Sequence, residues 1–167
     1  MINKAKISDL DSIMDIIDLT IEEMSSYNNT QWDKNYPQSN DFIIDIQKGD
    51  LYIKSTGKDI KGFICVNYIE PKEYNGLNWT SNQKCMVIHR MAVHPKYRNQ
   101  GIGSMLMKFA DELAIENNVN YLKTDTYSIN IKMNSLFNKK EFKFIGEMNF
   151  LGKEKPFYCY DKLITKI

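Results

Sequence analysis

Two glycines one residue apart, Gly101 and Gly103, constrain this chain most, because it has only 8 glycines among its 167 residues. They lie in the segment RNQGIGS, which begins at Arg98, between an apolar run ending at Val93 and a run with apolar residues at helical spacing. A strand that turns into a helix through glycines leaves main-chain N–H groups unpaired at the helix N-terminus, where phosphate binds well. We therefore expect an anion site here, closely approached at the glycines and supported by the charge of Arg98.

A glycine pair can also mark nothing more than a turn before a helix. Two familiar phosphate loops offer a check. The P-loop requires Lys-Ser or Lys-Thr after its last glycine, and neither glycine here is followed by such a pair. The dinucleotide fingerprint requires a third glycine at a position that Leu106 occupies. A nucleotide-binding regulator is therefore disfavoured.

The rest of the chain alternates strand-like and helix-like patterns around this segment. A Ser8–Asp11 capping box and apolar residues at helical spacing predict a first helix that runs to about Tyr27. The order of elements, β-α-α-β-β-β-α-β-α-β-β, is typical of an α/β protein built around a mixed sheet. Strands are expected over 2–7, 50–56, 59–69, 84–93, 121–127, 142–150 and 155–164, helices over 8–27, 40–49, 101–113 and 130–140, and a polar loop over 70–83.

Composition limits the classes of partner and the cellular compartment that we expect. With 22 basic and 21 acidic residues the net charge is +1, so nothing draws the chain toward nucleic acid or an anionic membrane. Three cysteines without metal-site spacing suit a reduced, cytoplasmic compartment. No apolar run approaches the ~18 residues that a membrane span needs, and the first residues lack a signal-peptide core. We expect one domain over residues 1–167.

The segment from Arg90 to Gly103, with Arg98-x-x-Gly101-x-Gly103 after a strand that ends in RMAVHP, resembles motif A of the GNAT superfamily of N-acetyltransferases. The segment YLKTDTYSINIKMNSLFNKKEF resembles motif B of that family, and the likeness runs from about Lys84 to Phe144. The pieces QW…YP and IHRMAV resemble small bacterial members. The resemblance implies a GNAT (acyl-CoA N-acyltransferase) fold, with a mixed, mostly antiparallel sheet flanked by about four helices.

The resemblance also implies acetyl-CoA as the acyl donor and no metal. The pyrophosphate would bind the main chain of the glycine segment, and the pantetheine arm would pair with the strand that ends at Val93, like an added strand. Asn130 would face the arm, although its position equally suits a helix N-cap. The donor-binding residues implied are Met91, Ala92, Val93, Arg98, Asn99, Gln100, Gly101, Ile102, Gly103, Ser104, Asn130 and Phe137.

Acetyl transfer to an amine needs a base, since an amine with a pKa of ~10.4 is almost fully protonated at pH 7. At the strand position where the family often carries a glutamate, this chain has His89. It could accept the proton or could simply be packed in the sheet; Glu23 or a chain of waters is the other source. The family's acid tyrosine is replaced by Phe137, so Tyr127 is our substitute, unless water protonates the thiolate or the thiolate leaves unprotonated. An ordinary strand-end aromatic would also explain Tyr127.

Trp32 and Tyr36, between the first two helices, would form an aromatic wall for the acceptor; alternatively they anchor that loop on the core. The sequence thus predicts an N-acetyltransferase acting on a primary amine of a small molecule by direct transfer in a ternary complex. Two alternatives stay open: a non-catalytic acyl-CoA-binding or sensing module, and a peptide or protein N-acetyltransferase. We expect a monomer or homodimer with no nucleic-acid or membrane partner.

Overall fold

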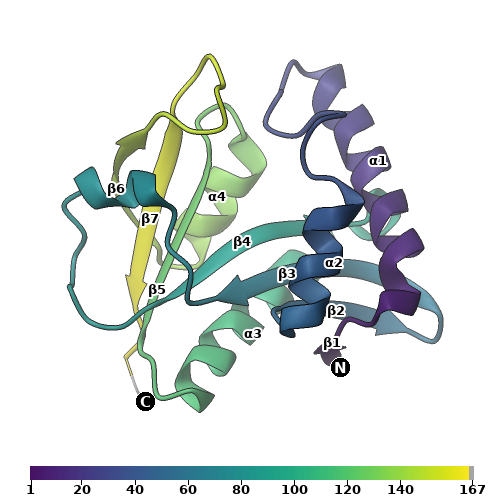
Figure 1. Cartoon of the computed structure of the whole chain (residues 1–167), viewed down its shortest axis with the longest axis horizontal. Helices are drawn as coiled ribbons and strands as arrows, with labels where there is room; N and C mark the ends of the chain where they lie inside the picture. Colours follow the sequence, from purple (N-terminus) through teal and green to yellow (C-terminus); the bar gives the residue numbers. More distant parts are fainter. Residues whose placement is uncertain (166–167) are drawn as a thin grey trace. The chain divides into compact units, whose positions relative to one another are not determined.

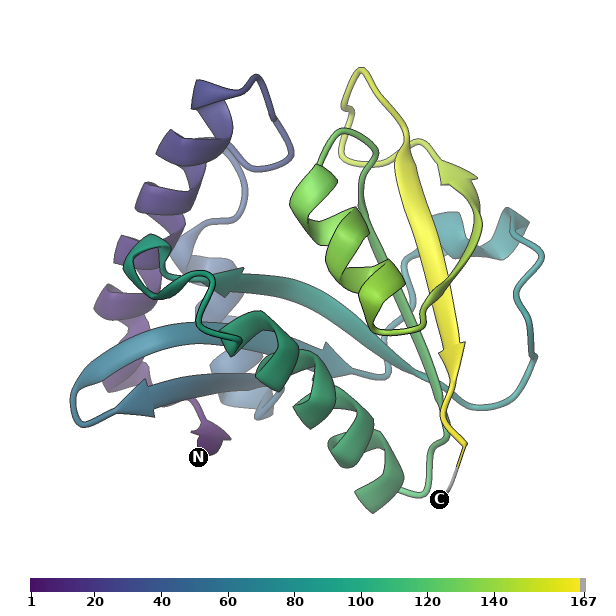
Figure 2. The same cartoon turned by 180° about the vertical axis from the view of Figure 1, so that it is seen from behind.

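A computed structural model describes residues 1–165 of the chain, and Figures 1 and 2 show it from two opposite sides. Every helix and strand expected from the sequence is present, with ends shifted by a few residues. The helices are α1 (Leu10–Ser26), α2 (Ser39–Lys48), α3 (Ile102–Glu116) and α4 (Ile131–Lys139), and the short 3-10 helices are η1 (Ile7–Asp9), η2 (Lys72–Gly76) and η3 (Pro95–Tyr97). The strands are β1 (Ile2–Lys4), β2 (Leu51–Thr56), β3 (Asp59–Asn67), β4 (Met86–Val93), β5 (Tyr121–Tyr127), β6 (Lys143–Met148) and β7 (Phe157–Leu163).

The strands form one mixed sheet of seven in the order β1-β2-β3-β4-β5-β7-β6. The β1–β2, β2–β3, β5–β7 and β6–β7 pairs are antiparallel, whereas β4 and β5 are parallel. A parallel pair needs a long crossover, and α3 supplies it in the connection from β4 to β5. The expected α/β architecture with a mixed, mostly antiparallel sheet and four helices is confirmed.

The chain divides into two compact units, and β4 passes from one to the other. The first unit contains residues 1–66 and 90–106, and the second contains residues 67–89 and those from 107 onward. The boundary on β4 falls between His89 and Arg90. The expectation of one domain over 1–167 stays a prediction.

In the first unit, the core is built by the apolar faces of α1 and α2 together with residues of β2 and β3. Ile13, Ile16 and Ile17 of α1 are fully buried, as their helical spacing predicts. The expected Ser8–Asp11 capping box is wrong. The chain first makes the short helix η1, in which the Lys6 N–H donates to Asp9 Oδ2 at 2.7 Å, so α1 begins only at Leu10.

In the second unit, a different apolar cluster forms around β5 and β7, and it includes Tyr121, Tyr127, Phe157 and Cys159. The segment 70–83, expected to be a polar loop, contains η2 and buries Tyr74 in this cluster. Across residues 1–165, no helix combines the length and apolar character required to cross a bilayer.

Candidate functional site

The segment 98–104, called the glycine loop below, carries main-chain N–H groups that the protein itself does not use. Asn99 and Gly101 have left-handed φ values of 59° and 77°, and the first bond of α3 runs from the Met105 N–H to the Gly101 carbonyl at 3.0 Å. Within the described part of the chain, no protein oxygen accepts the N–H groups of residues 99–104. A Cβ placed on Gly101 would meet no atom within 4 Å. This cradle has the geometry and polarity that an anion such as a pyrophosphate requires.

The sequence predicts that Arg98 supports the anion site, but in the structure its polar groups have partners within the protein. Its N–H bonds to the Pro95 carbonyl at 3.3 Å, so the cradle begins at Asn99. The Arg98 Nε donates to the Val93 carbonyl at 3.2 Å, and the guanidinium forms an ion pair with Glu23 of α1. Burial lowers the pKa of Arg98. The side chain therefore ties the glycine loop to α1, and Glu23, one of the alternative bases, is part of this ion pair.

The strand residues expected to pair with the donor's arm lie at the end of β4. Met91 and Ala92 are buried and Val93 is partly buried. The pairing of β4 with β5 covers Met86 to Ile88 only, so residues 91–93 have β3 as their neighbouring strand. A Cβ on Gly62 of β3 would lie 2.8 Å from the Ala92 carbonyl oxygen, which makes glycine necessary at that position.

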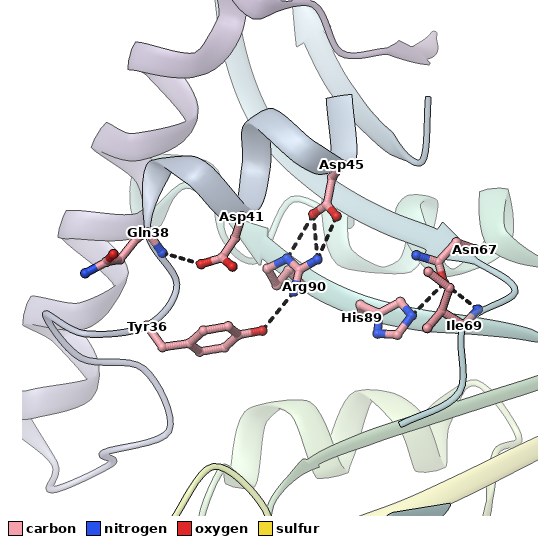
Figure 3. A network of polar contacts seen from close by, with 8 residues as sticks. All are labelled: Tyr36, Gln38, Asp41, Asp45, Asn67, Ile69, His89 and Arg90. Atoms are coloured by element: carbon pink, nitrogen blue, oxygen red, sulfur yellow. Dashed lines mark hydrogen bonds and ion pairs between the residues drawn. The ribbon is translucent and has the colours of Figure 1, made fainter. Parts of the chain in front are cut away.

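His89 is partly buried on β4, and its Nε2 lies 2.8 Å from Oδ1 of Asn67, the last residue of β3 (Figure 3). The same Asn67 oxygen accepts the N–H of Ile69 at 2.9 Å. The ring is therefore held by a specific polar partner, which the sequence did not indicate.

Arg90, the next residue on β4, belongs to a second polar network, within the first unit (Figure 3). Its Nε and Nη2 donate to the carboxylate of Asp45 on α2 at 2.9 and 2.8 Å, and its Nη1 donates to the Tyr36 hydroxyl at 2.9 Å. Burial alone would lower the pKa of Arg90, but Tyr36 and Asp45 raise it above its ordinary value. One signal could have revealed this pair: Asp45 lies on the buried side of α2, where a carboxylate needs a cation.

Trp32 is buried, with 6% of its surface exposed, and belongs to the core cluster of the first unit together with residues such as Ile13 and Phe42. The polar neighbours of Trp32 in the sequence do not reveal the core that covers it. The alternative, a tryptophan that anchors its loop, describes its packing. Tyr36 is partly buried and packs against the same cluster. An acceptor-binding role for either residue stays a prediction.

The start of α4 is organised by asparagine side chains. Asn130 is buried and is the N-cap of α4, since its Oδ1 accepts the Met133 N–H at 3.2 Å. The capping alternative is thus confirmed, and contact with the donor's arm stays a prediction. Asn134 Nδ2 donates to the carbonyls of Ser128 and Asn130, while its Oδ1 accepts the Tyr160 hydroxyl at 2.6 Å. Sequence reasoning did not single out Asn134.

Phe137, at the position of the family's acid tyrosine, and Tyr127, our substitute acid, are both packing residues in the second unit. Phe137, 1% exposed, lies between the rings of Phe142 and Tyr160 at centroid distances of 5.8 and 5.3 Å. Tyr127, also 1% exposed, accepts the Lys155 N–H with its hydroxyl at 3.1 Å. These contacts match the strand-end aromatic alternative for Tyr127. That bond engages an oxygen lone pair, so it leaves the phenol proton available, and the acid role stays a prediction.

Glu141 occupies the position where motif B usually has glycine, and its backbone retains the glycine-like conformation. Its φ is 65°, directly after the C-cap of α4, and the following Phe142 N–H bonds back to the Phe137 carbonyl at 3.0 Å. Such a bond, from the residue after the left-handed one back to the last helical turn, is typical of a Schellman helix end. The sequence departs from the motif while the helix end keeps its geometry.

Comparisons with known proteins agree on one family. The family model described as Acetyltransferase (GNAT) family matches residues 14–144, while a search of curated proteins finds no match. Among solved structures, an inferred acetyltransferase from Staphylococcus aureus Mu50 is 27% identical, with a TM-score of 0.78 and 99% of each chain covered. A GNAT-family acetyltransferase from Streptococcus agalactiae 2603 is 22% identical, with a TM-score of 0.85 over 99% of this chain and 96% of the other.

The family model covers well over half of the chain, and its span includes the glycine loop, all of β4 and the α4 region. Both solved structures share the fold over nearly the full length. Within residues 1–165, no group of three or more His, Cys, Asp or Glu side chains is arranged to hold a metal ion. The chain belongs to the GNAT family of acetyltransferases and is an acyltransferase with the GNAT fold.

Proposed function

We propose that this acetyltransferase moves the acetyl group of acetyl-CoA to a primary amine of a small molecule, by direct transfer in a ternary complex. Acetyl-CoA is the cosubstrate of the GNAT family. The observation that carries the proposal is the glycine loop, where six successive N–H groups, those of residues 99–104, have no acceptor within the described chain. Such a row of donors at a helix N-terminus suits the two phosphates of coenzyme A.

Acetyl-CoA would supply the acetyl group as a thioester, and the chain would hold and orient it. The glycine loop would bind the pyrophosphate, and the main chain of Met91 to Val93 would pair with the pantetheine arm as a neighbouring strand does. The Val93 N–H would stabilise the charge that develops on the thioester oxygen. Asn130 and Phe137 are the proposed contacts of the arm on α4.

His89 is our proposed base. It precedes Val93 by four residues on β4, and neutral imidazole accepts a proton readily near pH 7. The acceptor amine must lose a proton to become nucleophilic, and a positioned base contributes about 10²- to 10⁴-fold to such a step. For the leaving thiolate, Tyr127 is the proposed proton donor, with water as the alternative, since Phe137 has no proton to give.

The acceptor amine belongs to a small molecule in this proposal, with a peptide amine as the alternative. Neighbours in fold include an inferred phosphinothricin N-acetyltransferase at 16% identity and a ribosomal-protein-alanine N-acetyltransferase from Brucella melitensis at 14%. Such identities show the fold alone, so a small amine and a peptide amine both belong in the test. Tyr36 and Trp32 are the proposed acceptor contacts. We propose cytoplasmic action as a monomer or homodimer, consistent with the near-zero net charge and the three free, buried cysteines in the described chain.

A thiol-release assay with acetyl-CoA would test the proposal across polyamines, amino acids, aminoglycosides and peptides. We expect turnover with at least one small primary amine, together with a rise in melting temperature on adding acetyl-CoA. At a concentration 100-fold above Kd, binding to the native state adds about 2.7 kcal/mol of stability. Absence of any melting shift at millimolar acetyl-CoA would contradict the donor assignment, and turnover of peptides alone would contradict the acceptor assignment.

The base is tested with the two histidines of the chain, which form a matched pair. His89→Ala should lower kcat by about 10²- to 10³-fold and leave the affinity for acetyl-CoA unchanged, because a base acts on the acceptor. His94→Ala is the control: His94 precedes η3, where its Nδ1 accepts the Lys96 N–H at 3.1 Å. Equal activity of the two variants would show that the base is another group.

A further inference from the structure

We propose that Asn67 is a positioning residue that holds His89 in one tautomer, with the ring proton on Nε2 and the lone pair on Nδ1. The inference concerns a pair of side chains in the second unit, the last residue of β3 and the middle of β4 (Figure 3). Its importance for catalysis rests on the proposed role of His89 as base. The tautomer itself follows from two hydrogen bonds to the Asn67 oxygen, one from the Ile69 N–H and one from the His89 ring.

The first step is the orientation of the Asn67 amide. Asn67 is 8% exposed, and one end of its amide lies 2.9 Å from the main-chain nitrogen of Ile69. A main-chain N–H can only donate, so the amide atom facing it must be the oxygen. The residues 67–69 thus form a local turn in which the chain itself fixes the amide, independently of the histidine.

The second step is the protonation of the ring. The same Asn67 Oδ1 lies 2.8 Å from His89 Nε2. An amide oxygen has no proton to donate, so Nε2 must be the donor. Neutral imidazole carries one proton, and with Nε2 protonated the lone pair resides on Nδ1. A base at His89 would therefore accept the substrate proton on Nδ1.

The third step is the choice of an amide as the partner. In serine proteases a buried carboxylate fixes the histidine tautomer and also stabilises the imidazolium. Asn67 is neutral, so it fixes the tautomer and the ring orientation with little added attraction for the charged ring. This arrangement suits a histidine that must remain neutral, and ready to accept a proton, until the amine is bound.

Nitrogen-15 NMR of the imidazole rings tests the tautomer directly in the full chain. The spectrum is simple, because the chain has only 2 histidines. His94 is an internal reference: its Nδ1 accepts the Lys96 N–H at 3.1 Å, so its proton is also on Nε2. At a pH about two units above the ordinary histidine value of ~6.5, we expect His89 to show a protonated Nε2 and an unprotonated Nδ1.

Two variants of Asn67 separate the tautomer from general packing. At the same pH, Asn67→Ala should give the averaged nitrogen shifts of a neutral ring that exchanges between both tautomers at His89. The shifts of His94 should be unaffected. Asn67→Asp retains an oxygen that accepts from both Ile69 and His89, so it should keep the wild-type tautomer. A protonated Nδ1 in the wild type, or a single Nε2–H tautomer in Asn67→Ala, would overturn the inference.

Kinetics link this result to catalysis. If His89 is the base, Asn67→Ala should lower kcat about tenfold or more with little change in the KM for acetyl-CoA, since part of the base's ~10²- to 10⁴-fold contribution is lost. The expected NMR pattern together with wild-type turnover in both Asn67→Ala and His89→Ala would sustain the tautomer assignment and refute the base. An altered NMR pattern in the wild type would refute the tautomer whatever the turnover.

Discussion

Two connecting segments of this protein use their polar groups in opposite ways. The segment 68–85, called the β3–β4 segment below, bonds to its own unit: the Tyr74 hydroxyl donates to Asp125 at 2.6 Å, and the Thr80 N–H donates to Asp161 at 2.8 Å. In the glycine loop, by contrast, the N–H groups of residues 99–104 meet no protein acceptor in the described chain. The polar groups of the first segment thus hold it to the protein, whereas those of the glycine loop are available to a ligand.

Burial explains the contrast. Asp161 is 1% exposed and Tyr74 is equally buried, and a buried polar group left without a partner costs about 1–3 kcal/mol. The buried Tyr74 and Asp161 must therefore find their partners within the protein. Asn99, Gln100 and Gly101 are exposed, so water can satisfy their N–H groups until an anion replaces it. Exposed, unpaired donors suit a loop that binds a ligand, whereas bonds to buried partners suit a segment that stabilises the fold.

The largest effect should come from Asp161→Ala. Its carboxylate accepts the Thr80 N–H, the Thr80 hydroxyl at 3.0 Å and the Tyr121 hydroxyl at 2.7 Å, so the variant leaves the buried Tyr121 hydroxyl, and both Thr80 donors, without this acceptor. We expect a loss of about 3–5 kcal/mol in the free energy of unfolding, and a drop in melting temperature on the order of 10 °C, measured by thermal and urea denaturation.

The control for this loss is Asp18→Ala on the exposed face of α1, which should stay within about 0.5 kcal/mol of the wild type. A loss as small as this at Asp161 would show that the β3–β4 segment is not held by its bonds to β7. The contrast between the two segments would then disappear.

Gly103→Val should have the next largest effect, on binding. A branched side chain at the start of α3 would occupy the space where an anion approaches the main chain. Losing one or two charge-assisted bonds, at about 1.5–3 kcal/mol each, should weaken coenzyme A binding by roughly 100-fold, measured by calorimetry on the folded variant. The matched control is Gly76→Val in the β3–β4 segment, where an added Cβ meets nothing within 4 Å. Equal coenzyme A affinity of the two variants would assign the glycine pair to the turn alone.

The sequence predicts elements well where the signal is local. The spacing of Ile13, Ile16 and Ile17 defines the buried face of α1 without reference to any other segment. The glycine loop is similarly local, because strand, glycines and helix follow one another directly. By contrast, Thr80 and Asp161 are 81 residues apart, and no local pattern connects them.

The errors and omissions of the sequence-based predictions share one cause. Trp32 is flanked by polar residues, yet the core of the first unit covers it. His89 could be placed on its strand from the sequence, but its partner Asn67 lies 22 residues away. Arg98 was expected to face the anion, and its ion pair with Glu23 of α1 could not be inferred from spacing. Tertiary contacts, which local periodicity does not encode, decide these roles.

Asp125 should make the β3–β4 segment sensitive to pH. Burial raises the pKa of its carboxyl from 3.8 to about 6, and the negative charge of Glu73 adds to the rise, while the bond from Tyr74 opposes it. The folded state thus binds the proton more tightly than the unfolded state. Its stabilising contribution is complete below about pH 4 and is lost as the pH rises through about 6.

Asp125→Asn keeps an acceptor for the Tyr74 hydroxyl but cannot ionise. Measured against the wild type, its relative stability should therefore rise by on the order of 2 kcal/mol between pH 4 and pH 7, with coenzyme A affinity unchanged at both pH values. Urea denaturation at the two pH values gives this difference. Parallel stability curves for the two proteins would show that the carboxyl titrates alike in the folded and unfolded states.

The smallest effect is expected at Asn99, and it tests what makes the glycine loop a binding loop. Its φ of 59° is left-handed, a conformation that asparagine and glycine tolerate better than other residues. If the loop acts through its main chain, Asn99→Gly should preserve the N–H cradle. We expect the stability to change by less than about 0.5 kcal/mol and the Kd for coenzyme A by less than about threefold, which corresponds to under 1 kcal/mol. Asn99→Ala, which lacks this tolerance, should lose about 1 kcal/mol of stability. A large loss of coenzyme A affinity in the glycine variant would mean that the amide side chain itself binds the anion. The glycine loop would then act through a side chain, as the β3–β4 segment does, and not through its main chain alone.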